Sequence, residues 1–330
     1  MSDTPPAPAP RRVFVLGATG TIGKATVAAL LEKGHEVICF IRPGKPGAHR
    51  DLPAGAILRF GEVGDPVSIA RDGFRGERFD ALVSCLASRT GVPRDAWAID
   101  HRAHSDALAE ARRAGVTQVV LLSAICVQKP LLAFQQAKLA FETELIGSGL
   151  DWSIVRPTAF FKSLSGQIER VRAGKPFLVF GDGRLTACKP ISDGDLGRYI
   201  ADCLDNDSRR NRILPIGGPG AAITPLDQAE ILFGLLGRPP KIRHVPVRLL
   251  DTIIAVLDGL GRILPRLRDK AELARIGRYY ATESMLVLDP ATGRYDADAT
   301  PSAGTETLAG FYAQLVRGEA SVDLGEHAVF

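Results

Sequence analysis

Residues 13–44 have the sequence VFVLGATGTIGKATVAALLEKGHEVICFIRPG. An apolar strand pattern, a helical pattern and a second apolar strand pattern follow one another, with the glycine-rich turn GATGTIG between the first two. A helix N-terminus at such a turn faces an anion, and glycines let the backbone approach it closely. We therefore expect the turn to hold the pyrophosphate of a dinucleotide through Gly17, Thr19, Gly20, Ile22 and Gly23. The alternative, a turn that only reverses the chain, is disfavoured by its place between strand and helix.

The same alternation continues through the first half of the chain. Apolar strand patterns occupy residues 13–17, 36–41, 56–60, 80–85, 118–122 and 152–155. Helical patterns occupy residues 21–33, about 95–114 and about 131–148. Repeated β-α-β units form a parallel sheet. The predicted fold class is therefore α/β, with a Rossmann-like, doubly wound parallel sheet and a smaller C-terminal substrate lobe.

Two polar residues follow the second and third strand patterns. Arg42 stands where a site selective for NAD usually has an acid, and an arginine there can bind a 2′-phosphate, so we expect NADPH as the cofactor. A role as an ordinary surface residue is the alternative for Arg42. Asp65 is expected either to bond the adenine amino group or to start the next helix as its N-cap, and the sequence does not decide between them.

Three regions are expected along the chain. Residues 1–10, MSDTPPAPAP, are predicted to be a flexible tail, and residues 11–156 an NADP-binding Rossmann core. The segments within residues 157–330 are short and mixed, so we expect no independent core there. They should complete the main core and form the lobe that holds the substrate.

Composition excludes several classes of function. A net charge of +4 with scattered basic residues argues against nucleic-acid binding. Five well-separated cysteines predict reduced thiols in a cytoplasmic protein. No apolar run approaches the roughly 20 residues that span a bilayer. The segment 249–265, LLDTIIAVLDGLGRILP, predicts an amphipathic helix that covers a pocket or lies on a membrane surface, so a peripheral membrane contact stays open.

Ser123 ends the fifth strand pattern, and Lys138 lies in the next helical pattern. Together with the Gly-x-x-Gly-x-x-Gly turn and the VRPT that begins at Val155, they resemble the short-chain dehydrogenase/reductase superfamily in its extended or atypical branch. In that family a tyrosine four residues before the lysine protonates a carbonyl oxygen, and the lysine holds the nicotinamide ribose. The resemblance implies that Lys138 is catalytic and that Ser123 lies at the cofactor. The tyrosine's position is occupied by Phe134.

The missing phenol separates two kinds of reduction. Reducing a ketone places negative charge on oxygen, where a positioned acid contributes strongly. Adding hydride to a vinyl group conjugated with a large aromatic ring leaves charge that spreads through the ring, so the phenol is dispensable. Phe134 then either faces a flat ring system or only packs in the core, and both alternatives stay open.

Three longer segments resemble the family of divinyl (proto)chlorophyllide 8-vinyl reductases. They are LLSAICVQKPLLAFQQAKLAFE, VRPTAFFKSLSGQIERVRAGKPFLVFGDGRLTACKPISDGDL and MLVLDPATGRYDADATPSAGTETLAGFY. This likeness covers nearly all of residues 12–317, and members of the family also have phenylalanine with a retained lysine. It implies NADPH-dependent reduction of the C8 vinyl group of divinyl chlorophyllide or protochlorophyllide to ethyl, in chlorophyll and bacteriochlorophyll synthesis.

Matching blocks also imply substrate contacts. Phe161 and Lys162 in AFFKS, and Cys188 and Lys189 in TACKPIS, are expected near the divinyl tetrapyrrole, where a lysine could pair with a propionate. The proton that completes the reduction comes from Lys138, water or a group of the lobe, and the sequence does not choose.

No metal site is expected. His101 and His104 are spaced i, i+3 without a third ligand, so we expect solvated helix histidines. The alternative function is that of a non-catalytic NADP-binding regulator or assembly protein that has lost the tyrosine.

Overall fold

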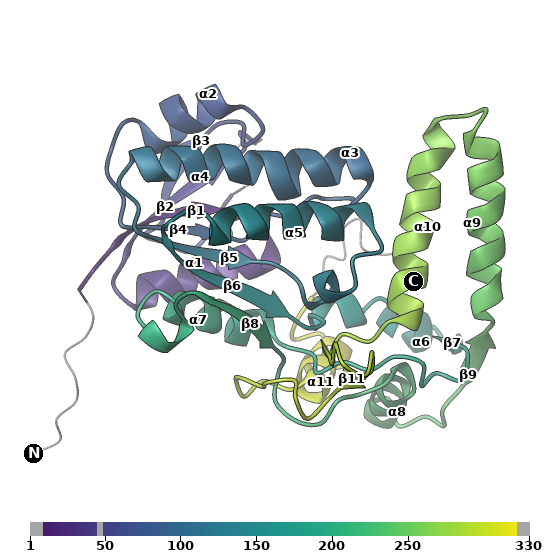
Figure 1. The fold of residues 1–330 in the computed structure, drawn as a ribbon. Helices are drawn as coiled ribbons and strands as arrows, with labels where there is room; N and C mark the ends of the chain where they lie inside the picture. Colours follow the sequence, from purple (N-terminus) through teal and green to yellow (C-terminus); the bar gives the residue numbers. More distant parts are fainter. Residues whose placement is uncertain (1–8, 45–48, 322–330) are drawn as a thin grey trace, which may run out of the picture.

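The computed structural model describes residues 9–44 and 49–321 and contains a seven-stranded parallel sheet (Figure 1). In spatial order its strands are β3 (Ile57–Phe60), β2 (Glu36–Ile41), β1 (Arg12–Leu16), β4 (Ala81–Ser84), β5 (Gln118–Leu122), β6 (Asp151–Pro157) and β8 (Arg212–Ile216). The order reverses direction between β1 and β4, and in open α/β sheets ligands bind outside the carboxyl ends of the strands at such a point. The predicted doubly wound parallel sheet is confirmed.

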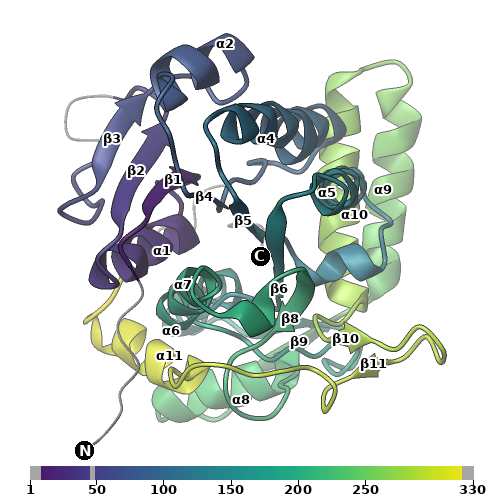
Figure 2. The same cartoon turned by 60° about the vertical axis from the view of Figure 1, so that its left-hand side comes forward.

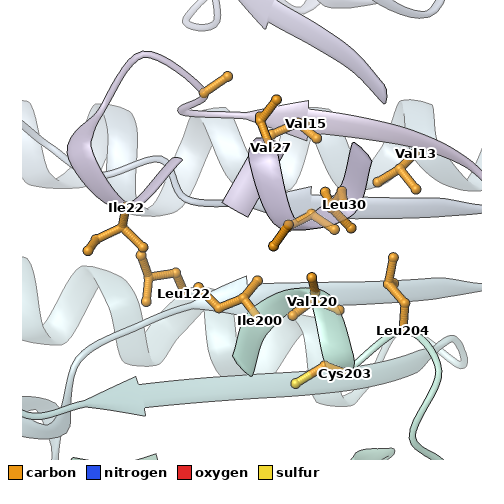
Figure 3. Packing of buried hydrophobic residues seen from close by; sticks show 14 of the residues in the cluster. Val13, Val15, Ile22, Val27, Leu30, Val120, Leu122, Ile200, Cys203 and Leu204 are labelled. Atoms are coloured by element: carbon orange, nitrogen blue, oxygen red, sulfur yellow. The ribbon is translucent and has the colours of Figure 1, made fainter. Parts of the chain in front are cut away.

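Helices cover both faces of the sheet. One face carries α1 (Thr21–Glu32) and α7 (Asp193–Asp202), while the other carries α4 (His104–Arg113) and α5 (Ala133–Ile146) (Figures 1 and 2). Neighbouring residues of a strand point to opposite faces. In β1, Val13 and Val15 therefore join the apolar cluster under α1 and α7, seen in Figure 3, while Phe14 and Leu16 join the cluster on the other face. After their first residues, β1 and β2 are apolar throughout because both of their faces are buried.

The helix predicted at about residues 95–114 is longer and irregular. It begins as α3 (Pro93–Ala96), passes through the π-helical turn Trp97–Ala103 and continues as α4. The short helix α2 (Pro66–Ser68) continues in the same way into the π-helical turn Ile69–Phe74. Such turns insert an extra residue into the helical hydrogen-bond pattern, which rotates the side chains that follow, and they are frequent at functional sites.

The C-terminal lobe has a core of its own, contrary to expectation. It is built from α6 (Ile168–Arg172), β7 (Phe177–Phe180), α8 (Pro225–Leu235), β9 (Ile242–Val245) and α11 (Leu308–Arg317). Their apolar faces form one buried cluster, with Tyr312 fully buried in it. The sequence did not predict this core because its short apolar faces come from segments far apart in the chain. Strand β7 pairs with β9, and α11 packs on α8. The segments α7 and β8, by contrast, join the main sheet layer.

A helical hairpin projects beside the lobe. It consists of α9 (Val247–Gly261) and α10 (Arg266–Thr282), and it is followed by the small antiparallel pair β10 (Val287–Leu288) and β11 (Tyr295–Asp296) (Figure 1). Within residues 9–44 and 49–321, no helix has the length and apolar character needed to cross a membrane. Most of the predicted N-terminal tail, residues 1–8, lies outside the described residues, as do residues 322–330 of the predicted lobe.

The contact between α1 and α7 depends on Gly197 and generates a prediction. A β-carbon there would lie 2.6 Å from the Ala25 carbonyl carbon and 2.8 Å from the Thr26 nitrogen, both of them backbone atoms. Gly197→Ala should therefore lower the free energy of unfolding by about 1–3 kcal/mol, measured by urea denaturation. Gly234→Ala in α8 is the matched control, because nothing lies within 4 Å of the added carbon. It should raise stability by about 0.5–1 kcal/mol, and equal effects of the two changes would contradict the packing described.

Candidate active site

The glycine turn after β1 lies against the end of β4. A β-carbon on Gly17 would lie 2.4 Å from the Cys85 carbonyl carbon, and the backbone of Gly17 has φ of +75°, so only glycine fits. A β-carbon on Gly23 would lie 2.1 Å from the Gly17 oxygen. Both positions therefore require the missing side chain, which explains two of the three glycines through close packing.

The N-terminus of α1 is open to an anion. Its N-cap, Gly20, has extended backbone and offers no side-chain hydrogen bond, and the first turn carries no acidic residue. The first N–H groups of a helix lack partners within the helix, so they are available to a phosphate. Thr19 is exposed beside them, whereas the side chain of Ile22 is buried in the core. Ile22 can thus contribute only backbone atoms to a cofactor.

Arg42 and Asp65 have different surroundings. Arg42 is exposed and directly follows β2, at the same edge of the sheet as the glycine turn. Asp65 is the N-cap of α2, where its Oδ1 accepts a hydrogen bond from the Val67 N–H at 2.9 Å. The structure thus shows the helix-capping alternative for Asp65. Glu62, which the sequence analysis did not consider, is an exposed carboxylate. It lies closer along the chain to the end of β3 than Asp65 does.

Lys138 is held by a buried carboxylate. It stands in the second turn of α5, and its Nζ lies 3.0 Å from Oδ1 of Asp100, whose side chain is fully buried. The same Oδ1 accepts a hydrogen bond from the Ser88 N–H at 3.1 Å. Asp100 therefore links the loop after β4, the π-helical turn and α5. Sequence reasoning missed it because its pairing depends on how the π-helical turn rotates that side chain.

His104 lies behind this ion pair and is buried, so the expectation of a solvated histidine is wrong for it. Its Nδ1 lies 2.9 Å from the Ile99 carbonyl oxygen and its Nε2 lies 2.8 Å from Ser84 Oγ. Burial lowers the pKa of His104 to about 4, and the nearby positive charge of Lys138 acts in the same direction. His101 is half-buried, 3.7 Å from Glu144. The part of the chain that the structure describes contains no group of metal-ligating side chains.

Ser123 is hydrogen-bonded within the fold. Its hydroxyl donates to the buried carboxylate of Glu142, which also pairs with Arg156 of β6. The Ser123 N–H donates to the Val155 carbonyl at 2.7 Å. These bonds join β5, β6 and α5 below the site. The hydroxyl that was predicted to contact the cofactor therefore already donates its proton to Glu142.

Phe134 lies one helical turn before Lys138 and is 8% exposed. It belongs to an apolar cluster in which the Rossmann core meets the later segments, since Cys126 and Cys188 are both members. Ile276 of α10 packs against this cluster. A β-carbon on Gly91 would lie 3.4 Å from the Phe134 ring, so the loop after β4 also covers the ring. The surroundings of the missing phenol are therefore apolar on several sides.

The four lobe residues predicted to touch the substrate are not gathered in one place. Phe161 is buried in the lobe core, where its ring lies 5.4 Å from that of Phe311. Cys188 is buried among backbone bridges, and burial raises the pKa of its thiol to about 12. Lys189 Nζ donates to the Thr300 carbonyl at 2.9 Å. Phe161 thus packs in the lobe core, whereas Cys188 belongs to the same apolar cluster as Phe134.

Lys162 lies instead at the glycine turn. Its Nζ donates to Oγ1 of Thr21, the first residue of α1, at 3.3 Å. Asp193, the first residue of α7, is also near: burial raises its pKa to about 6, and the charge of Lys162 partly offsets that rise. Lys162 thus places a cation from the lobe beside the N-terminus that can hold a phosphate.

Two hollows on the surface are lined by residues other than the glycine turn and Lys138. One of about 780 Å³ lies on the flank of the core between α2 and α4, lined by Val67, Arg71 and Glu110. Another of about 410 Å³ lies between the start of α5 and the hairpin, lined by Leu132, Ile254 and Tyr279 among others. The candidate site consists of the glycine turn and Lys138. Both are tied to the loop after β4, the turn through Gly17 and Cys85, and Lys138 through Asp100.

Comparisons with known proteins agree with this geometry. An NAD(P)H-binding family matches residues 17–207, so the chain binds a nicotinamide cofactor. The divinyl chlorophyllide a 8-vinyl-reductase, chloroplastic, of Oryza sativa subsp. indica is 49% identical over 337 residues, which cover 98% of this chain and 83% of the relative. The photosystem II assembly factor Ycf39 of Cyanophora paradoxa is 24% identical, covering 72% of this chain and 73% of that protein.

Among solved structures, the NADPH-dependent quinone oxidoreductase QOR2 of Escherichia coli, complexed with NADPH, superposes with a TM-score of 0.64. It is 17% identical, and the match covers 92% of this chain and 99% of that chain. At this identity the likeness shows the fold alone.

The ion pair of Lys138 and Asp100 generates a prediction of stability. A double-mutant cycle of Asp100→Asn and Lys138→Met, followed by urea denaturation, should give a coupling energy of at least about 1 kcal/mol, because each single change leaves a largely buried partner without its countercharge. The matched control is the exposed pair of Glu169 and Arg172, with N–O distance 2.9 Å. Its coupling should stay below about 0.5 kcal/mol. A buried pair that couples no more strongly than this surface pair would refute the anchoring of Lys138.

Proposed function

The chain belongs to the divinyl chlorophyllide a 8-vinyl-reductase family, and we propose that it reduces the C8 vinyl group of divinyl chlorophyllide or protochlorophyllide to ethyl with NADPH. The observation that carries the proposal is 49% identity across 98% of the chain. The matched length includes both the sheet and the lobe. The likeness therefore extends to the part expected to hold a substrate.

The residues at the strand ends fit a nicotinamide cofactor. The open N-terminus of α1, at Gly20, would hold the pyrophosphate, and Lys138 would hydrogen-bond the nicotinamide ribose. When bound, the reduced nicotinamide supplies a hydride. Asp100 keeps the Lys138 ammonium in one position. A ribose bound to that ammonium would hold the nicotinamide ring in one orientation.

The apolar surroundings of Phe134 suit a carbon-carbon double bond. Hydride reaches the terminal vinyl carbon and a proton reaches its neighbour, so the product gains two hydrogens. No oxygen becomes negatively charged at the reacting atoms, so an acid at position 134 is not required. Phe134, covered by Ile276 and the loop at Gly91, excludes water from this side of the site.

The alternative, a regulator or assembly protein without catalysis, is not favoured. The assembly factor matches only 72% of the chain at 24% identity, half that of the reductase. Carbonyl reduction and sugar epimerisation are disfavoured, because in this superfamily they rely on the tyrosine that Phe134 replaces.

Arg42 and Lys162 divide the recognition of the cofactor. We place Arg42 at the 2′-phosphate, which only NADPH carries, because it is exposed directly after β2. Lys162 was expected at a substrate propionate. Its bond to Thr21 favours the pyrophosphate, which NADPH and NADH share.

The reaction itself can be tested directly. Purified protein with NADPH and solubilised divinyl chlorophyllide or protochlorophyllide should yield a pigment two hydrogens heavier, with C8 ethyl and an untouched C3 vinyl group. Chromatography, mass spectrometry and loss of NADPH absorbance measure it. Tight NADPH binding without any pigment product would reject the enzyme and favour the regulator, whereas reduction at C3 would reject only the proposed orientation of the macrocycle.

The selectivity for NADPH over NADH gives a further prediction. Arg42→Glu should weaken NADPH binding at least roughly tenfold in fluorescence titrations without pigment, with a smaller effect on NADH, because a carboxylate repels the 2′-phosphate. Lys162→Met is the comparison and should weaken both cofactors by a similar factor of about five or more. Equal affinities of the unaltered protein for NADPH and NADH would overturn the role of Arg42. A Lys162→Met variant with normal cofactor affinity and a raised KM for pigment would return Lys162 to the substrate.

A further inference from the structure

Helix α9 carries an apolar stripe that is open to solvent. Leu249, Ile253, Val256 and Leu260 are each 40–53% exposed, and their spacing of four, three and four residues places them on one face of the helix. The stripe continues into the turn between α9 and α10, where Ile263 is 80% exposed. Leu264 beside it is also exposed. Large apolar side chains grouped in this way mark an interaction surface.

This stripe is not a wall of the neighbouring hollow. At 3.6 residues per turn, Asp251, Ile254 and Ala255, which line the hollow, lie on the side of α9 nearly opposite to Leu249 and Val256. The face toward α10 is this same side of α9. The ion pairs of Asp251 with Arg278 and Asp258 with Arg275 lie there and also border the hollow. One side of α9 therefore lines a hollow, as one of the sequence alternatives has it, while the stripe on the opposite side faces neither the hollow nor α10.

The turn between the helices is cationic. Arg262, Arg266, Arg268 and Lys270 stand within nine residues that contain a single acid, Asp269. All four are exposed, and in the part of the chain that the structure describes none of them pairs with a carboxylate. Positive charge thus surrounds the most exposed apolar residues, Ile263 and Leu264. We call residues 262–270 the hairpin tip.

The hairpin tip is free to meet a surface. Figures 1 and 2 show α9 and α10 projecting side by side, with α9 outermost and the tip at the end away from the lobe. An exposed apolar stripe along a helix, with basic residues beside it, is the arrangement by which helices lie in the interface of a membrane. Each Lys or Arg near an anionic lipid surface adds attraction.

We propose that the hairpin docks on an anionic lipid surface, with the stripe of α9 in the interface and Ile263 and Leu264 inserted among the headgroups. A two-fold contact with a second copy through the tip would bring like charges together, whereas anionic headgroups complement them. This docking does not depend on the reaction proposed above. It is tested without pigment or cofactor.

The experiment is co-sedimentation of the full chain with vesicles of phosphatidylcholine alone or with added phosphatidylglycerol. The unaltered protein should bind the anionic vesicles more tightly and lose binding as salt is added. The double variant Ile263→Ser, Leu264→Ser should bind anionic vesicles at least about tenfold more weakly. Arg262→Gln, Arg266→Gln should lower the same affinity roughly 25-fold, about fivefold for each charge, with little effect on neutral vesicles.

Matched controls keep the result specific. Val67→Ser removes an apolar residue that is 61% exposed on α2, and Arg294→Gln removes an exposed charge between β10 and β11. Both should bind vesicles normally. The tip variants should retain the circular dichroism spectrum and cofactor affinity of the unaltered protein, because they change exposed side chains only.

Three outcomes would overturn the proposal. The first is a lack of binding to either vesicle by the unaltered protein, and the second is equal binding by the tip variants and the controls. The third is a dimer in sedimentation velocity that dissociates on Ile263→Ser, Leu264→Ser, which would assign the surface to self-association.

Discussion

The buried ion pair between Lys138 and Asp100 is the interaction on which the site depends. A lysine on an exposed helix face would sample many rotamers, but here a fully buried carboxylate holds its Nζ at 3.0 Å. Asp100 is itself held by the Ser88 N–H. The loop after β4, the π-helical turn and α5 therefore keep a fixed arrangement at the carboxyl edge of the sheet. The glycine turn meets the same edge, where Gly17 packs on Cys85, so the phosphate and ribose sites proposed above would share one set of backbone contacts.

The chemistry follows from what stands beside this pair. An anchored lysine with phenylalanine at position 134 can orient a cofactor, but that position offers no acid to a developing alkoxide. The apolar cluster around Phe134 suits a substrate whose charge spreads over a large ring during hydride addition. The same surroundings would oppose ketone reduction. A lysine at position 138 and a phenylalanine at position 134 thus both suit the reduction of a carbon-carbon double bond.

Most of the fold could be predicted from the sequence, and less of the site. Strand and helix patterns are local, so β1, α1 and β2 were predicted nearly to the residue, as was the turn that holds Gly17 and Gly23. The direction of a side chain depends on packing between distant segments. Phe161 and Cys188 therefore lie in the lobe and its junction, and Lys162 reaches Thr21, although all three stand in blocks that suggested substrate contacts. The role of Asp100 could not be predicted, because no local sequence pattern indicates the π-helical turn that orients its side chain.

The account is tested most directly by following the hydrogens. Reduction of the divinyl pigment with NADPH that carries deuterium at the transferable C4 position should place one deuterium on the terminal carbon of the new C8 ethyl group. A reaction in deuterated water should place solvent deuterium on the neighbouring carbon, adjacent to the ring. That pattern is expected if charge spreads into the macrocycle after hydride addition. Cofactor deuterium on the carbon next to the ring, or its absence from the product, would contradict the phenol-free mechanism.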